Sequence, residues 1–248
     1  MATIKGTKEW AAKNINLFTG DCPNGCIYCY AKANNHRFNK PSEYRVKEEL
    51  LTKTFRKRDY LTMYPSAHDI RFADIYFHLT FLKNFLKSGS PILIVSKPTS
   101  LVVSILCHEL MPFRDQIEFR FTIGSYRNDV LAFYEPNAPN YDERFAASMV
   151  AWTNGFKVSL SIEPMLDTHP DRIIKDVKDF ITGDIWVGKL NHPKARLVAN
   201  GHRDKIDRVM ELAEWQSKDE NILRIVERLS KYPNLRWKDS IQEVIKRN

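Results

Sequence analysis

Short apolar runs alternate with longer amphipathic segments along most of the chain. The runs have the length and the β-branched content of buried strands, and the segments between them repeat apolar residues at steps of three and four. This alternation is typical of a parallel sheet with helices on its outside. It predicts strands at residues 15–19, 60–64, 91–96, 117–123, 157–162 and 184–187.

Two of the intervening segments carry the clearest helical pattern. In the first, apolar residues recur from Ile75 to Leu86, and a Ser-Gly pair follows as a stop signal. In the second, Pro170 opens a helix whose apolar stripe runs from Ile173 to Ile181. Both segments are expected to pack as helices on one face of the sheet.

These elements add up to about six β/α units, which predict the fold class α/β. We expect a partial (β/α)6 TIM-like barrel with additional C-terminal helices. Residues 1–200 would form the barrel, and residues 201–248 would form a helical extension packed on it, as one structural unit. In such a barrel, chemistry belongs at the carboxyl ends of the strands, where the βα loops gather.

Three of the four cysteines lie close together, directly after the first predicted strand. Cys22, Cys26 and Cys29 have the spacing C-x3-C-x2-C. Thiolates are the usual ligands of iron–sulfur clusters, and four cysteines are needed to coordinate all four irons of a cubane cluster. Three cysteines would leave one iron open to a small molecule. The loop therefore predicts a reactive cluster rather than a mere electron carrier.

Other uses of these cysteines fit the sequence less well. A structural zinc site is closed and has four ligands; His36 or Cys107 could supply the fourth, but neither belongs to a recognisable pair. A disulfide framework is not indicated by four cysteines in 248 residues without a secretory signal. Core cysteines that cluster by coincidence rarely lie this close together.

Composition indicates the cellular compartment but does not identify the substrate. The segment Met1–Trp10 has no apolar core for export, and no apolar run is long enough to span a membrane, so we expect a cytoplasmic protein without a membrane partner. The net charge of +8 permits nucleic-acid binding but does not require it, because a solvated basic face would give the same value.

The cysteine loop resembles the hallmark of the radical S-adenosylmethionine (AdoMet) superfamily, and Tyr28 before the last cysteine fits that pattern. Residues 94–97, 120–123, 133–139 and 144–147 resemble the branch that contains spore photoproduct lyase and DNA repair photolyase-like proteins. The resemblance covers roughly residues 14–167. It is highly specific for the superfamily at the cysteine loop and less specific for the branch.

This resemblance implies a cofactor and a chemistry. Cys22, Cys26 and Cys29 would hold a [4Fe-4S] cluster whose open iron binds the amino and carboxylate groups of AdoMet. An external one-electron reductant of the flavodoxin or ferredoxin type would drive cleavage of AdoMet to a 5′-deoxyadenosyl radical. That radical would abstract hydrogen from a substrate.

The resemblance also implies cofactor contacts at the strand ends. Lys97 would offer its ammonium group to the AdoMet carboxylate, a charge-assisted contact. Ser66, with His68 and Asp69 as interchangeable alternatives, would contact the amino group, because the usual Gly-Gly-Glu form is absent there. Glu135 would bind the cofactor or pair with Arg144. The cofactor-binding candidates are Tyr28, Ser66, Lys97, Thr122, Ser125, Glu135, Ser161, Glu163, Pro164 and Leu190.

One departure from the branch concerns catalysis. Spore photoproduct lyase has a cysteine hydrogen donor after its second strand, whereas residues 64–69 here contain none, and Cys107 lies in an apolar helical context. Tyr64 is a candidate substitute, and Glu163 and Lys189 are further catalytic candidates. Gly188 would let a ligand approach the backbone, with Lys189 and Asn191 offered to the substrate.

The sequence leaves the substrate open. A nucleic acid, for lesion repair or modification, fits the charge and the branch; a peptide or a small molecule would use the same core residues. A non-catalytic electron-transfer protein would not need the Lys97 pattern. A wide basic groove beside the barrel mouth would favour a nucleic acid, and a closed pocket under the C-terminal helices would favour a small substrate.

Overall fold

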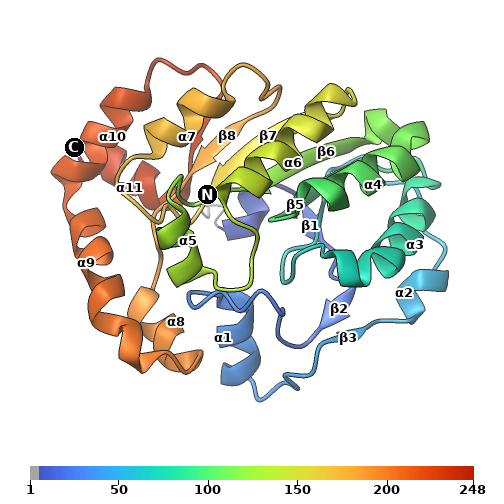
Figure 1. Cartoon of the computed structure of the whole chain (residues 1–248), viewed down its shortest axis with the longest axis horizontal. Helices are drawn as coiled ribbons and strands as arrows, with labels where there is room; N and C mark the ends of the chain where they lie inside the picture. The colour runs from blue at the N-terminus through green and yellow to red at the C-terminus, as the bar shows by residue number, and fades with distance from the viewer. Residues whose placement is uncertain (1–5) are drawn as a thin grey trace.

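The computed structural model describes residues 6–248, which contain a curled sheet of seven parallel strands (Figure 1). The order in the sheet is β1-β4-β5-β6-β7-β8-β9, so from β4 onward each strand lies beside the next one in sequence. The curl leaves β1 and β9 as the two edges of a half-barrel. The bounds are β1 (Lys13–Asn14), β4 (Thr62–Tyr64), β5 (Ile92–Ser96), β6 (Ile117–Thr122), β7 (Lys157–Ile162), β8 (Ile185–Val187) and β9 (Leu235–Trp237).

Most helices lie on the outside of this sheet, and some lie across its open side (Figure 1). The first half of the chain supplies α1 (Tyr30–Arg37), α2 (Glu49–Thr52), α3 (Ile75–Leu86), α4 (Ser100–Leu110) and α5 (Asn128–Tyr134), with 3-10 turns at Gly6–Glu9, Phe72–Asp74 and Met111–Gln116. The second half supplies α6 (Tyr141–Thr153), α7 (Pro170–Val177), α8 (Pro193–Ala199), α9 (Ile206–Ser217), α10 (Asp219–Leu229) and α11 (Asp239–Arg247), with a 3-10 turn at Arg203–Lys205.

The two faces of the sheet differ in polarity, as β6 illustrates. Successive side chains of a strand point to opposite faces. Phe119 and Phe121 join the main hydrophobic core under the helices. Arg120, between them, points into the barrel, where it donates to Glu118 at 2.9 Å and lies over the ring of Trp10 at 5.1 Å. The inside of the half-barrel is therefore lined partly by paired charges.

The predicted α/β fold is confirmed, with a correction at its first strand. The sheet strand is Lys13–Asn14, not the apolar run at 15–19; Phe18–Thr19 forms β2, which pairs antiparallel with β3 (Arg45–Val46) in a separate sheet. Leu17 in this run is completely buried. A buried connection has the same apolar signature as a strand, so the pattern alone could not separate them.

The C-terminal region contains the expected helices and one strand that was not expected. Helices α9, α10 and α11 agree with the helical extension predicted for residues 201–248. Between them, β9 pairs with β8 and adds a seventh strand to the sheet. Its three residues include a central arginine, so no apolar run marked it. The division between residues 200 and 201 stays a prediction.

The segment at Gly6–Trp10 contacts both edges of the half-barrel. On one side, Asn14 of β1 donates to the hydroxyl of Thr7 at 3.1 Å. On the other side, the backbone N–H of Asp239, just after β9, donates to the carboxylate of Glu9 at 3.2 Å. Residues 6–10, which belong to the segment expected not to be a secretory signal, thus help to close the barrel. Residues 1–5 lie outside the described residues. Within residues 6–248 no helix has the length and hydrophobicity to cross a bilayer.

Candidate cofactor and substrate cavity

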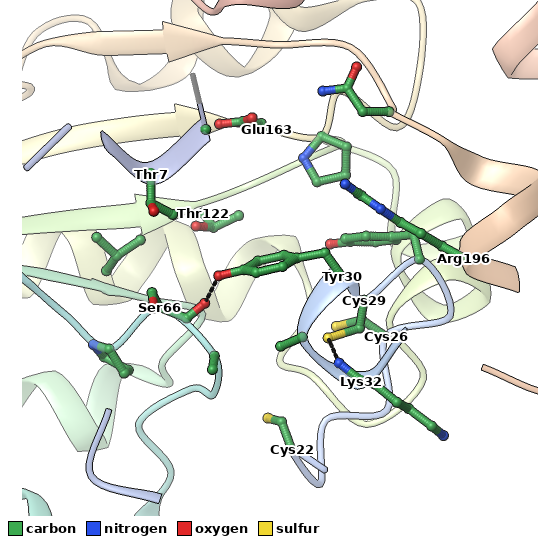
Figure 2. Close-up of a pocket in the computed structure, with 18 of the residues that line it drawn as sticks. Thr7, Cys22, Cys26, Cys29, Tyr30, Lys32, Ser66, Thr122, Glu163 and Arg196 are labelled. Carbon is green, nitrogen blue, oxygen red and sulfur yellow. Dashed lines mark hydrogen bonds between the residues drawn. The ribbon is translucent and has the colours of Figure 1, made fainter. Parts of the chain in front are cut away.

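A cavity of about 790 Å³ opens at the carboxyl ends of the strands. Its volume falls within the range of sites that bind small molecules. Figure 2 shows the three cysteines at one end and Glu163 at the opposite end, with Tyr30 and Thr122 between them. Of the sequence candidates, the cavity is lined by Cys22, Cys26, Cys29, Tyr28, Ser66, His68, Asp69, Lys97, Thr122, Glu163, Pro164, Lys189 and Asn191.

The cysteine loop is held in place by contacts with distant segments. Cys29 is the N-cap of α1, and its sulfur accepts the backbone N–H of Lys32 at 3.5 Å. The side chain of Asn200, just after α8, donates to the backbone carbonyls of Ile27 at 2.9 Å and Cys29 at 3.0 Å. The loop therefore has a defined conformation in which all three cysteines reach the same cavity.

The three cysteine sulfurs do not converge on one point as the ligands of a single bound ion would. Among residues 6–248, no group of three or more His, Cys, Asp or Glu side chains is placed to hold one ion. A cluster presents several separate irons, so its thiolate ligands do not have to meet at one point. Burial raises the pKa of Cys22 to about 11, so this thiol would need a bound cation to become a thiolate.

The alternative zinc ligands lie elsewhere. The ring of His36 bonds the backbone carbonyl of Ala199 at 2.6 Å and the carboxylate of Asp21 at 3.2 Å. Cys107 is completely buried within α4 and belongs to the main hydrophobic core. Neither residue lines the cavity, so neither is in position to complete a closed zinc site with the loop.

Lys97 follows β5 and carries a positive charge into the cavity wall. Its ammonium group lies 3.3 Å from the carboxylate of Asp69, which also accepts the backbone N–H of Lys97 at 2.9 Å. Burial disfavours the charged ammonium, but the negative charges of Asp69 and Glu135 outweigh it and raise the pKa of Lys97 well above its usual value. Lys97 is therefore a permanent cation beside the cysteine loop.

Ser66 is fixed by Asn16, which follows β1. The backbone N–H of Ser66 donates to the Asn16 side chain at 2.7 Å, and the Asn16 amide donates to the Ser66 hydroxyl at 3.1 Å. The hydroxyl of Tyr30 donates to the Ser66 carbonyl (Figure 2). Of the three alternatives, Asp69 is committed to Lys97, and the ring of His68 accepts the backbone N–H of Phe18 at 3.2 Å.

Glu135 lies behind the cavity rather than in it. Its carboxylate pairs with Arg144 at 2.5 Å, both side chains being completely buried, and it accepts the hydroxyl of Tyr28. Arg144 also donates to the carbonyls of Pro139 at 2.7 Å and Thr122 at 3.2 Å. The structure thus contains the ion pair of Glu135 and Arg144, which supports Tyr28 from behind.

Several other candidates are not brought to the cavity. Tyr64 is completely buried in the core, and its hydroxyl lies 2.6 Å from a ring nitrogen of His78. Ser125 donates to Asp167, and Ser161 is completely buried. Leu190 lines a neighbouring cavity, and its N–H donates to Gln216 at 2.8 Å. Strand ends place these residues near the rim, but side-chain direction decides which of them face a ligand.

The cavity also contains residues that the sequence analysis missed. Tyr30 directly follows the last cysteine, and Arg196 of α8 lies over its ring, 6.0 Å from the centroid (Figure 2). Thr7 and Lys8 come from the N-terminal segment, and Ser240 comes from α11. Tyr30 could have been found from the sequence, because it adjoins the cysteine motif. The other residues reach the cavity only because segments far apart in the sequence close the barrel.

Fold and site together define a class: a half-barrel of parallel strands with a three-cysteine loop at its carboxyl rim. No protein-family model matches the chain, and no curated protein matches its sequence. Solved structures of spore photoproduct lyase do match it in three dimensions. The resemblance to that branch is therefore confirmed for the fold.

The similarity covers most of this chain. A variant of spore photoproduct lyase with one cysteine replaced by serine has a TM-score of 0.57 and 17% identity, over 82% of this chain and 64% of that one. A double variant with bound AdoMet and dinucleoside spore photoproduct has a TM-score of 0.53 and 19% identity, over 77% and 61% of the two chains. The chain thus covers less than two thirds of the length of these neighbours.

The buried pair behind the cavity makes a stability prediction. Replacing Arg144 with Met leaves the Glu135 carboxylate buried without its cation, which should lower the free energy of unfolding by about 3–5 kcal/mol. Urea denaturation of the purified protein measures this change. Arg127→Met, which breaks an exposed pair with Asp129, is the control and should show no measurable change. Equal behaviour of the two variants would contradict the structural role of the buried pair.

Proposed function

We propose that the chain is a radical AdoMet enzyme that holds a [4Fe-4S] cluster through Cys22, Cys26 and Cys29. The observation that carries the proposal is the convergence of this cysteine loop and Lys97 on one cavity at the carboxyl rim of the half-barrel. A solved structure with the same fold contains AdoMet, which supports the same cofactor here. An electron-transfer protein would have no use for a cavity of this size beside its cluster.

The residues around the cavity divide into roles along its length. When bound, the cluster supplies the electron that cleaves AdoMet to the 5′-deoxyadenosyl radical, which takes hydrogen from the substrate. Lys97 binds the carboxylate of AdoMet, and Ser66, which Asn16 holds in place, contacts its amino group. Thr122 lies between the cysteines and Glu163, and Pro164 also lines the cavity. The reductant is an external flavodoxin- or ferredoxin-type protein.

For the substrate, we infer a nucleic acid, with lesion repair or base modification as the reaction. A neighbour with the same fold holds dinucleoside spore photoproduct. The net charge of +8 and the guanidinium group of Arg196 in the cavity favour a phosphate-bearing ligand. Arg196 has no carboxylate partner among the ion pairs of the described residues within 4 Å.

A second candidate is a radical AdoMet enzyme that acts on a small molecule or a peptide. The observation in its favour is the position of the cavity under the C-terminal helices, since α8 and α11 both contribute to its wall. The N-terminal segment closes the barrel on the same side. A walled cavity suits a small substrate or a nucleotide turned out of its strand more than an intact duplex.

Cysteine variants test the cofactor assignment. Anaerobic reconstitution with iron and sulfide should give about four irons per chain and a broad visible absorbance. Cys22→Ala, Cys26→Ala and Cys29→Ala should each lose most of this iron and all release of 5′-deoxyadenosine from AdoMet under reducing conditions. Cys107→Ala is the matched control and should retain both. Full iron content in any of the three loop variants would rule out the assignment.

A substitution of Lys97 tests the AdoMet contact. Lys97→Met removes the cation that faces the carboxylate of AdoMet, and the loss of a charged hydrogen bond should weaken AdoMet binding about tenfold or more. Calorimetric titration of the reconstituted protein measures this affinity. Iron content serves as the control, because the variant should retain its cluster. Unchanged affinity would show that Lys97 does not bind the cofactor.

The salt dependence of nucleic-acid binding separates the two substrate candidates. A single-stranded oligonucleotide should bind at low salt, and the logarithm of its affinity should fall linearly with the logarithm of salt concentration. Arg196→Ala should weaken binding and reduce this slope by about one. Lys178→Ala, outside the cavity lining, is the control and should do neither. No binding at low salt would favour the small-substrate candidate.

A further inference from the structure

Lys238 is a buried cation that no sequence motif marked as a candidate. It follows β9, and its side chain is 0% exposed. Its ammonium group donates to the carbonyl of Gly6 at 2.6 Å and lies 3.0 Å from the carboxylate of Glu9 and 3.4 Å from that of Glu163. A buried charge needs partners of this kind, because an unpaired ammonium would be costly to desolvate.

Two tryptophans and a glycine complete the surroundings of Lys238. Its ammonium group lies 4.5 Å from the ring centroid of Trp10 and 5.6 Å from that of Trp186, within the range of cation–π attraction. A Cβ atom on Gly188 would lie 2.8 Å from Cγ of Lys238 and 3.1 Å from Cγ of Glu163. The close approach expected at Gly188 is therefore made by these two side chains.

Of the three charged side chains in this cluster, Glu163 reaches the cavity. Its side chain is 20% exposed, against 8% for Glu9 and 0% for Lys238. Figure 2 shows Glu163 at the end of the cavity opposite the cysteines, beyond Thr122. A ligand whose amino acid end lies at the cysteines and Lys97 would place its nucleoside end toward Glu163.

We propose that Lys238 is a positioning residue, which together with Glu9 fixes the Glu163 carboxylate so that it accepts a hydrogen bond from the nucleoside end of AdoMet. The inference rests on the proposed function for its ligand. It adds a link between the N-terminal segment, the last strand and the cofactor. Hydroxyl and amino groups of a nucleoside are the donors that such a carboxylate accepts.

The first test needs no cofactor. Burial raises the pKa of Glu163, and Lys238 opposes this shift. Without Lys238 the carboxylate should hold its proton more tightly in the folded than in the unfolded protein, so stability should be lost as pH rises. Lys238→Met should therefore lower the melting temperature more at pH 7 than at pH 5. The charged or titratable groups around Glu163 are Glu9, Tyr30, Arg120, Arg196, Lys238 and Asp239.

Two further variants make this test specific. Adding Glu163→Gln to Lys238→Met should remove much of the pH dependence, because the uncompensated carboxylate is gone. Lys157→Met breaks a partly exposed pair with Glu118 at 2.7 Å in the same barrel and is the matched control; it should change little at either pH. A deficit in Lys238→Met that is the same at both pH values, or that Glu163→Gln does not reduce, would overturn the positioning role.

The second test measures AdoMet binding to the reconstituted protein. Glu163→Gln should raise the Kd about tenfold or more, as expected for a lost charged hydrogen bond. Lys238→Met should raise it more at pH 6 than at pH 8, and Lys157→Met should leave it unchanged. Normal affinity in Glu163→Gln would overturn the ligand contact. If the parent protein does not bind AdoMet, the proposed function and this contact fail together, while the melting data still decide the role of Lys238.

Discussion

Parallel pairing of seven strands is the constraint on which the rest of the molecule depends. Parallel strands all end at the same rim, so residues from distant parts of the sequence meet there without any contact of their own to bring them together. Lys97 after β5, Thr122 at the end of β6 and Glu163 after β7 share one cavity for this reason. The cysteine loop joins them because α1 and Asn200 hold it over the same rim.

Burying charged groups at this rim requires that each find a partner. Lys97 pairs with Asp69 and Glu163 with Lys238, and in both pairs at least one member lines the cavity. The pair of Glu135 and Arg144 lies behind Tyr28. Isolated charges would not survive in such a place, because desolvation would exceed any gain from packing. The pairs thus keep ligand-facing groups charged and directed before a ligand arrives.

Much of the fold followed from the sequence because buried strands and amphipathic helices have distinct periods. β5 is a continuous apolar run, and β6 and β7 alternate apolar with polar residues, so the pattern of these strands was unambiguous. The prediction of strands was wrong where a strand is too short to show its period, or where a buried segment outside the sheet is as apolar as a strand. Lys13–Asn14 is too short to show a period, and the apolar residues after it belong to a buried connection. β9 has polar neighbours and exists because β8 offers it an edge.

The site residues that could be predicted from the sequence are those marked by a pattern of neighbouring residues. The cysteine spacing and the position of Lys97 after a strand can each be read from a few neighbouring residues. Tyr64 and Ser125 show that a strand end alone does not give the direction of a side chain. No local sequence pattern marks Lys238, which lies between β9 and α11. Its role follows only from its contacts with Gly6, Glu9 and Glu163 in the folded chain. Because the N-terminal segment and the last strand meet at this residue, Lys238 links the closure of the barrel to Glu163 at the end of the cavity.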